Sequence, residues 1–339
     1  MNNANIDIAV LLLFFNRPQT FKKVFEEVKK ARPSKLFLYQ DGARGEQDMK
    51  GIMACREIAS DENIDWECEV CRNYQTKNYG CDPSGYMAHT WAFSLADKCI
   101  VLEDDVVPSQ SFFPFCKEML DKYENDERIT MITGYNPEEI TQSCPYDYLF
   151  TSVFDIWGWA SWRRVVSKWD AEYSFLNDDY NMKQLTALAR QRGYRKDLIK
   201  MCHDHSTSGK QYFESIFWTN MLFNSGLAIM PTHNQINNVG LTAGAHYSAD
   251  LETMPKRLRK TFTMKRFELK FPLRHPKYII EDVAYKERYY KIMAWNNPFT
   301  KMSYSLEELW LNIKAGNMKK IATATINNIK RHLGLTKHK

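Results

Sequence analysis

Apolar and polar residues follow a regular order in the first part of the chain. A nearly continuous apolar run at residues 6–15 ends in Asn16-Arg17-Pro18, and a second run at 35–39 ends in Gln40-Asp41-Gly42. Short runs of this kind are typical of strands buried on both faces of a parallel sheet. Helical spacing at 21–31 and about 47–60 separates these strands from each other and from a third strand expected near 65–71. This alternation predicts an α/β fold, with a mostly parallel sheet flanked by helices.

The pattern continues to about residue 135 and then changes. We expect a helix at 85–96, a strand at 99–102, a helix at 112–123, a strand at 129–133 and a later helix near 211–224. After about residue 250 basic residues dominate, and residues 314–339 contain no acid. We therefore expect a domain at 1–250, with halves of about 1–135 and 136–250, and a basic C-terminal extension with helices at 251–339.

Composition narrows the class of protein without naming a function. The 339 residues are 44% hydrophobic, which is enough for a sizeable core, and the net charge of +5 fits a partner that carries phosphate groups. No apolar stretch approaches the length of a membrane-spanning helix, and the polar start lacks the features of a signal peptide. We therefore expect a cytoplasmic protein.

The strongest candidate for chemistry is the acidic triplet Glu103-Asp104-Asp105, which directly follows the apolar strand at 99–102. Three adjacent acids at the end of a buried strand are costly without a counter-ion. Ligands of open α/β sheets bind beyond the carboxyl ends of the strands, where Mn²⁺ or Mg²⁺ can join a carboxylate to substrate phosphates. A solvated acidic loop is an equally good interpretation of the triplet alone. Arg17 and Asp41 end two other strands, so they should open on the same edge of the sheet.

With these residues in view, the sequence resembles nucleotide-sugar transferases of the GT-A fold. It is similar to the N-acetylglucosaminyltransferase I group and to bacterial GT-A enzymes of surface-polysaccharide clusters. Four segments across roughly residues 6–248 carry the resemblance. They are Phe14-Phe15-Asn16-Arg17-Pro18, Tyr39-Gln40-Asp41-Gly42, Ile100 to Ser109 with Phe112-Phe113, and Gly226 to Pro231 with Asn238-Val239-Gly240 and Ala245-His246.

The resemblance implies a role for each site residue. Asp105 would be the direct ligand of Mn²⁺ or Mg²⁺, and His246 would complete the metal site or touch the diphosphate. Asp104 would face the sugar or ribose, beside Glu103 of the same triplet. Arg17 and Asp41 would hold the nucleotide, and Asn78 would lie in a loop near the donor. Residues 1–135 would then be the nucleotide-binding half and 136–250 the acceptor half of a catalytic domain.

The implied reaction is inverting transfer of a sugar from a nucleoside diphosphate donor, expected to be UDP-linked, to a glycan or lipid-linked acceptor. Such a transfer needs a general base near the acceptor hydroxyl. In related bacterial sequences an acid between aromatic residues lies about a dozen residues before the Gly-Leu strand, which matches Glu214 here. The family residue is more often aspartate, so Asp155, Asp170 and Asp204 stay open as alternatives.

Trp157, Gly158 and Trp159 are the candidates for an acceptor wall, because aromatic faces pack against sugar rings and glycine allows close approach of the backbone. An aromatic core is the alternative interpretation of this segment. The acid-free C-terminus carries apolar residues at helical spacing. It could lie on an anionic membrane or pack on the domain.

Two rival functions stay open. A sugar-1-phosphate nucleotidyltransferase would share the sheet, but Asn16-Arg17-Pro18-Gln19-Thr20 has no glycine to cradle a triphosphate. A catalytically inactive GT-A-like protein that binds a glycan or scaffolds an assembly is the second rival. No nucleic-acid-binding motif is present, and we expect no nucleic-acid partner.

Overall fold

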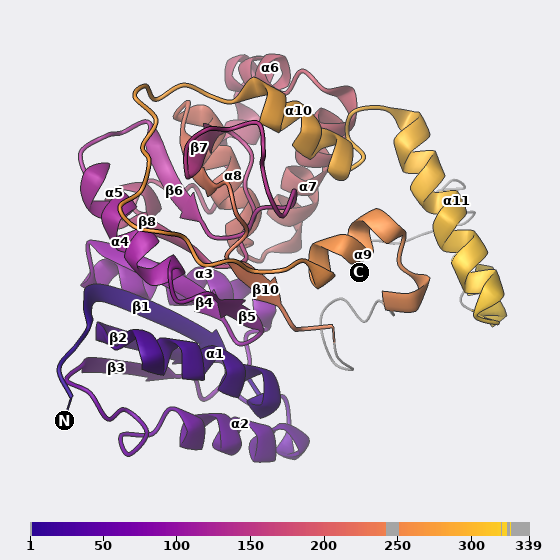
Figure 1. The fold of residues 1–339 in the computed structure, drawn as a ribbon. Coiled ribbons are helices and arrows are strands. Elements are labelled where there is room, and N and C mark those ends of the chain that lie inside the picture. Colours follow the sequence, from indigo (N-terminus) through magenta and orange to yellow (C-terminus); the bar gives the residue numbers. More distant parts are fainter. Residues whose placement is uncertain (1, 242–250, 320, 324–325, 327–339) are drawn as a thin grey trace.

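The computed structural model describes residues 2–241, 251–319, 321–323 and 326, and Figure 1 shows their path. Its centre is an eight-stranded sheet in the order β3-β2-β1-β4-β8-β6-β9-β7. The strands are β1 (Ile6–Phe14), β2 (Pro33–Gln40), β3 (Glu69–Tyr74), β4 (Lys98–Glu103), β6 (Ile129–Thr133), β7 (Tyr148–Thr151), β8 (Trp159–Trp162) and β9 (Leu227–Pro231). Only β7 and β8 run against the common direction of the other strands in this sheet. The predicted α/β class with a mostly parallel sheet is confirmed.

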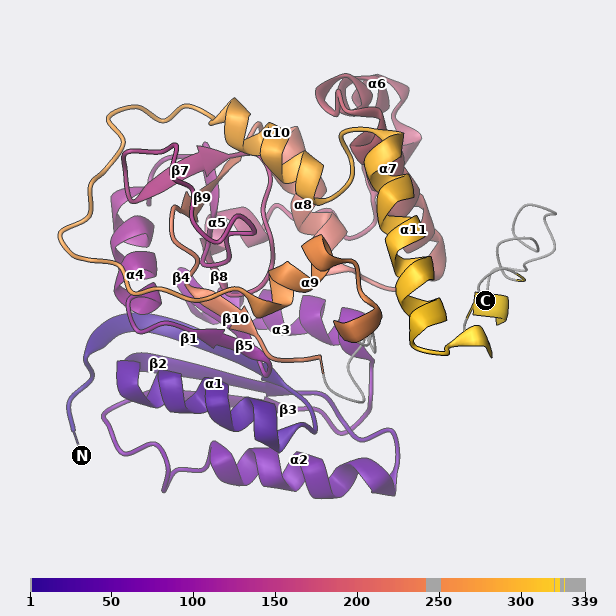
Figure 2. The same ribbon diagram turned by 45° about the vertical axis from the view of Figure 1, so that its right-hand side comes forward.

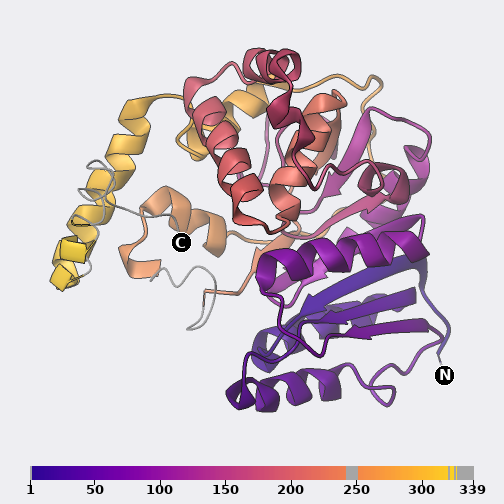
Figure 3. The same cartoon turned by 180° about the vertical axis from the view of Figure 1, so that it is seen from behind.

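Helices cover both faces of the sheet. They are α1 (Pro18–Ala31), α2 (Glu46–Ile58), α3 (Cys81–Leu95), α4 (Phe112–Lys122), α5 (Arg163–Val166), α6 (Asp179–Leu188), α7 (Arg192–Ser208), α8 (Phe213–Phe223), α9 (Lys256–Thr263), α10 (Val283–Ile292) and α11 (Pro298–Lys314), with short 3₁₀ turns η1 (Ser174–Asn177) and η2 (Leu251–Thr253). Helices α1 and α4 lie on one side of the sheet and α3 on the other (Figures 1 and 3). A small antiparallel ribbon of β5 (Val106–Pro108) and β10 (Ile236–Asn238) lies beside the sheet.

The N-terminal elements follow the apolar pattern closely, with two local differences. Helix α1 begins at Pro18 rather than after Thr20, because proline suits the first helical position, and Thr20 is buried inside the helix. The third strand starts at Glu69 instead of about 65. The indole of Trp66 is buried and donates to the Pro33 carbonyl oxygen at 2.8 Å, so this stretch packs before the ladder with β2 begins.

A second hydrophobic cluster lies away from the N-terminal half. It joins α7, α8 and α10 around buried aromatic side chains, of which Tyr173, Tyr194 and Tyr285 are examples. Helices α6–α8, dark red to orange in the view from behind, gather above the N-terminal half (Figure 3). Ile216, near the start of α8, belongs to this cluster, which therefore fixes the N-terminal part of α8.

The described part of the segment expected as a basic extension contains the helices α9, α10 and α11 and a non-helical stretch at 264–282, and much of it packs on the rest of the chain. Met264 and Leu273 are buried in the main core, and Tyr285, Tyr289 and Tyr290 of α10 belong to the second cluster. Helix α11 instead projects from the body (Figures 1 and 2). Within the described residues, no helix has both the length and the hydropathy needed to cross a bilayer.

Candidate active site

Three polar strand ends meet at one edge of the sheet. Strand β1 lies between β2 and β4 and is parallel to both, with Leu13 beside Glu103 and Phe14 beside Gln40. The order of strands reverses at β1, since β2 lies on one side and β4 on the other. Ligands of open α/β sheets bind in the crevice at such a point. The triplet Glu103-Asp104-Asp105 therefore lies at the switch point of this sheet.

Arg17 serves as the counter-ion of the triplet. Its guanidinium pairs with the Asp104 carboxylate, and Nη2 lies 3.1 Å from Asp105 Oδ2. Burial raises the pKa of Asp104 to about 6, although the charge of Arg17 opposes this shift. Burial disfavours the charged Arg17 side chain, but the two aspartates together raise the pKa of the guanidinium. Asp104 also accepts from Phe15 N at 3.3 Å, so its oxygens face β1 and Arg17 rather than an open sugar pocket.

Asp105 keeps one carboxylate oxygen for another partner. Oδ2 faces Arg17, whereas the buried Oδ1 has no hydrogen-bond partner among the residues that the structure describes. The Asp105 carbonyl oxygen accepts from Val239 N at 2.8 Å, and a Cβ on Gly240 would overlap Oδ2. The chain after β10 therefore crosses directly over this carboxylate. His246 follows this crossing in sequence but lies outside the described residues.

The Asp41 carboxylate holds a loop that carries Asn78. Its oxygens accept from Gly42 N at 2.9 Å, Tyr79 N at 3.0 Å, Gly80 N at 2.9 Å and Asn78 Nδ2 at 2.9 Å. A nucleoside hydrogen bond to Asp41 would require one of these donors to leave. The pair of Asp41 and Asn78 was expected to lie near the donor, and the two side chains do contact each other.

Glu214 comes to the triplet from far along the chain. It lies in the first turn of α8, whose Phe213 packs against Gly85 of α3. The side chain is half-buried, its Oε2 has no hydrogen-bond partner within the described ranges, and burial raises its pKa to about 7. Glu103 has its pKa raised well above the usual range, first by burial and then by the charges of Asp105 and Glu214. Glu214 is therefore close enough to the triplet for its charge to act on Glu103.

The alternative carboxylates differ in their surroundings. Asp170 accepts from Ser174 N at 2.7 Å and organises a turn. Asp204 pairs with Lys200 on the surface of α7. Asp155 keeps a buried Oδ2 without a partner in the described structure, and burial raises its pKa to about 7. Tyr289 of α10 donates to the carbonyl oxygen of the adjacent Phe154 at 3.0 Å, which places Asp155 beside α10, so Asp155 is the second carboxylate that could act as a base.

The predicted acceptor wall is wrong for Trp159 and Gly158, which face the interior of the protein. Trp159 is fully buried in β8, with its ring 5.1 Å from that of His89, so it belongs to the core. Gly158 has φ +66°, and a Cβ there would overlap the side chain of Ile236. The close approach that glycine allows is therefore to β10, within the protein. Trp157 is half-buried, 4.8 Å from Tyr135 and 5.0 Å from Phe262 between ring centroids.

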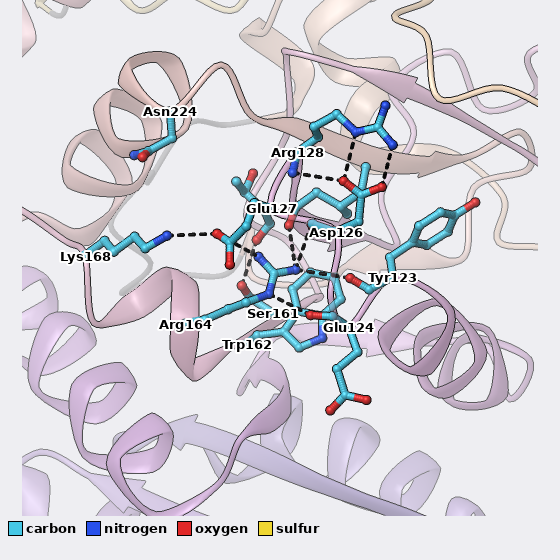
Figure 4. Close-up of polar contacts among 12 residues, drawn as sticks. Tyr123, Glu124, Asp126, Glu127, Arg128, Ser161, Trp162, Arg164, Lys168 and Asn224 are labelled. Atoms are coloured by element: carbon cyan, nitrogen blue, oxygen red, sulfur yellow. Dashed lines mark hydrogen bonds and ion pairs between the residues drawn. The ribbon is translucent and has the colours of Figure 1, made fainter.

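Arg164, at the end of the same segment, has a structural role (Figure 4). Its Nη2 donates to the carbonyl oxygens of Tyr123, Asp126 and Ile129 at 3.0–3.2 Å, and Nε donates to that of Glu124 at 2.9 Å. These bonds close the connection between α4 and β6. The guanidinium also lies 4.4 Å from the ring of Trp162.

Three contacts at the site were not expected from the sequence. Gly240 abuts Asp105, although Asn238-Val239-Gly240 had been noted as a motif. Asp82, in the first turn of α3, adds to the raised pKa of Glu214 after burial. Ser215 Oγ lies 2.7 Å from His205 Nδ1 and 2.6 Å from Tyr173 Oη, which anchors the turn that carries Glu214. Of these three contacts, only that of Asp82 had a local signal in the sequence, namely an acid in the first turn of a helix.

The site can accept a divalent cation only with help from a substrate. In the described part of the chain, no three His, Cys, Asp or Glu side chains converge as a ready metal site. Asp105 Oδ1 is a buried carboxylate oxygen without a partner, and acids around it outnumber the one arginine. Such a site suits Mn²⁺ or Mg²⁺ held by one carboxylate, water and phosphate oxygens.

The sequence matches no protein-family model and no curated protein. Solved structures that share part of its architecture include inositol-1-phosphate CTP transferase from T. maritima, at 8% identity and TM-score 0.36 over 76% of this chain and 96% of that one. Mouse xyloside xylosyltransferase 1 is 10% identical, with a TM-score of 0.31 over 64% of this chain and 81% of that one. Glucosyl-3-phosphoglycerate synthase from Mycobacterium tuberculosis is 13% identical, with a TM-score of 0.28 over 47% of this chain and 57% of that one. Likeness of this extent assigns neither family nor activity, so function must be argued from the site.

Proposed function

We propose that this protein is a metal-dependent glycosyltransferase that moves a sugar, with inversion, from a nucleoside diphosphate to an acceptor hydroxyl. The observation that carries the proposal is the approach of Glu214 to the acidic triplet. A carboxyl group with a pKa of about 7 can exist as a base at neutral pH and still be strong enough to take a proton. A metal carboxylate and a nearby base are the two groups that a single displacement requires.

The donor half of the reaction would use Asp105 and Arg17. A bound Mn²⁺ or Mg²⁺ would neutralise the charge that develops on the leaving diphosphate. Asp105 Oδ1 is the free ligand for that cation, and the Arg17 guanidinium could turn from Asp105 to a phosphate oxygen. Asp41 and Asn78 would shape the nucleoside end of the site through their loop. Uridine is the first base to test.

Glu214 would accept the proton of the acceptor hydroxyl while its oxygen attacks the anomeric carbon. The bond from that carbon to the diphosphate breaks in the same step, and its electron pair leaves with the diphosphate. One displacement inverts the anomeric configuration. Trp157 is the remaining aromatic candidate for the acceptor side. A glycan or a lipid-linked sugar would be the acceptor, and His246 is retained as a possible second metal ligand.

The rival nucleotidyltransferase finds less support at the strand end. Only residues 15–17 separate β1 from α1, and Pro18 at the first helical position has no backbone N–H to offer a phosphate. Arg17 turns toward the triplet instead of lining a phosphate loop. The inactive scaffold remains the alternative if no donor is turned over.

A donor screen tests the proposal. Purified full-length protein is incubated with a panel of nucleotide sugars, with and without Mn²⁺, and released nucleoside diphosphate is measured. Mn²⁺-dependent release from one donor, lost in Asp105→Asn but retained in the exposed-site control Glu308→Gln, is expected. Pyrophosphate release from a nucleoside triphosphate and a sugar 1-phosphate would favour the nucleotidyltransferase. No turnover and no metal-dependent nucleotide binding would favour the inactive scaffold.

A further inference from the structure

Helix α11 stands apart from the body of the protein. Asn312 is its only buried residue, and few contacts tether it (Figures 1 and 2). Tyr304 Oη donates to the Ile292 carbonyl oxygen at 3.1 Å, and Glu307 accepts from Lys256 N at 3.0 Å. Most of the helix surface is therefore open to solvent.

One side of α11 is apolar. Six large side chains on it are exposed, from 42% for Leu309 to 75% for Phe299. We call this set the α11 stripe: Phe299, Met302, Leu306, Leu309, Trp310 and Ile313. With about 100° of rotation per residue, these positions span an arc of only about 100°, and both glutamates of the helix fall outside it. A contiguous exposed apolar surface of this kind marks a place of contact with a membrane or a partner.

A basic groove adjoins the stripe. It lies between α9, α10 and α11, has a volume of about 520 Å³, and is lined by Lys256, Arg257 and Lys291 together with Phe299 of the stripe. Among the described residues these three basic side chains have no ion-pair partner, although Glu307 of α11 also lines the groove and accepts from Lys256 N. Arg257 also lines a second groove of about 490 Å³, which includes Lys260 and Arg288. Positive charge without partners thus lies directly beside exposed apolar side chains.

The sequence beyond the stripe has the same sign of charge. From Leu309 to Lys339 the chain contains seven lysine and arginine residues and no aspartate or glutamate. This combination favours an anionic lipid surface, because apolar side chains can enter the headgroup boundary while lysine and arginine meet phosphates. A second copy of the chain is disfavoured, since pairing two stripes would bring two basic grooves together.

We propose that α11 and the adjoining groove dock this protein on an anionic bilayer. The α11 stripe enters the boundary between headgroups and acyl chains. Lys256, Arg257 and Lys291 contact lipid phosphates. This assignment moves the expected membrane contact from the acid-free C-terminal residues to the helix before them.

The docking surface lies on the same side as the candidate active site. Phe262 of α9 packs against Trp157, and α9 adjoins β10, whose partner β5 begins directly after the acidic triplet. Docking would therefore bring the acceptor side close to the membrane. That consequence rests on the proposed function, whereas docking itself does not.

Flotation with lipid vesicles tests the docking surface. Full-length protein is mixed with vesicles of phosphatidylcholine alone or with about 30 mol% phosphatidylglycerol, at low and high salt. We expect binding to the anionic vesicles that weakens with salt. Trp310→Glu should reduce binding at least tenfold. Lys301→Gln changes the net charge equally on the opposite side of α11 and removes only an exposed ion pair with Asp197, so it should not.

Three results would overturn the proposal. One is failure of the protein to bind anionic vesicles, and another is equal binding by Trp310→Glu and Lys301→Gln. The third is a dimer in sedimentation velocity that Trp310→Glu dissociates, which would assign the stripe to a second copy. Circular dichroism checks that the variants keep their helix content. Donor turnover in solution should be the same in both variants, because neither residue belongs to the candidate active site. Absence of donor turnover in the unmodified protein would count against the proposed function and not against docking.

Discussion

Replacing Glu214 by glutamine should have opposite effects on activity and on stability. As a base, Glu214 must be ionised, so the transfer rate of the unmodified protein should rise with pH through about 7. Glutamine cannot take the proton, and the rate should fall by about 10²- to 10⁴-fold, the usual contribution of a general base. The variant should lose activity while its fold becomes more stable at neutral to basic pH.

The stability gain follows from linkage. Burial raises the pKa of Glu214 from 4.5 to about 7, so between these values the unfolded chain binds fewer protons than the folded one. Stability therefore falls as pH rises from about 4.5 to 7 and then levels off. At 1.36 kcal/mol per pH unit the cost is at most about 3 kcal/mol. Glutamine removes this cost, but its amide has no hydrogen-bond partner at the Oε2 position, which reduces the gain by about 1 kcal/mol. We expect a net gain of about 2 kcal/mol at pH 8 and none at pH 4.5.

Urea unfolding followed by tryptophan fluorescence measures this difference. The unmodified protein and Glu214→Gln are compared at pH 4.5 and pH 8 without metal or donor, since either would change the local charge. Glu308→Gln, an exposed substitution on α11, is the matched control and should behave alike at both pH values. The same stability difference at both pH values would refute the linkage argument. Transfer by Glu214→Gln at the unmodified rate would remove Glu214 as the base.

Three further substitutions test other parts of the site and its support. Asp105→Asn should weaken Mn²⁺ binding in the presence of UDP at least tenfold, followed by electron paramagnetic resonance without acceptor; unchanged binding would remove Asp105 as the ligand. Gly240→Ala should lower metal-dependent turnover at least tenfold, because its Cβ overlaps Asp105 Oδ2, whereas Gly45→Ala faces only the flexible Gln47 side chain and should leave turnover unchanged. Arg164→Leu should destabilise the fold by about 2–4 kcal/mol in urea, because four backbone carbonyls lose the guanidinium as a donor and, among the described residues of this connection, those of Glu124 and Ile129 have no backbone donor beside it, while the exposed Arg128→Leu should cost under about 1 kcal/mol; equal costs would contradict the clamp in Figure 4.

Local pattern was enough for the N-terminal sheet and the edge where the site lies. The apolar run at 6–15 is typical of a strand buried on both faces, and β1 is found at Ile6–Phe14. Once β1, β2 and β4 are parallel neighbours, Arg17, Asp41 and the acidic triplet must lie on one edge. This inference needs only strand order and direction, which crossover rules restrict strongly.

Orientation of side chains could not be predicted in the same way. Trp157 and Trp159 share the alternation of a strand, and nothing in the local sequence tells which face is the core. Antiparallel insertion of β8 between β4 and β6 decided that Trp159 is buried against α3 and α8. Likewise, the turn at Pro18 aims Arg17 at the acids, although an arginine at a strand end could equally have faced solvent.

The sequence by itself determined the class of fold, the edge of the sheet that carries the acids, and which residue types are available there for chemistry. These follow from short-range periodicity and from the shared direction of parallel strands. Only the tertiary structure decided which acids are paired, that Asp105 Oδ1 is left free, and that Glu214 faces a triplet more than a hundred positions earlier. The reason is physical: burial and pairing of a charge depend on what packs around it, and those neighbours come from segments that are distant along the chain.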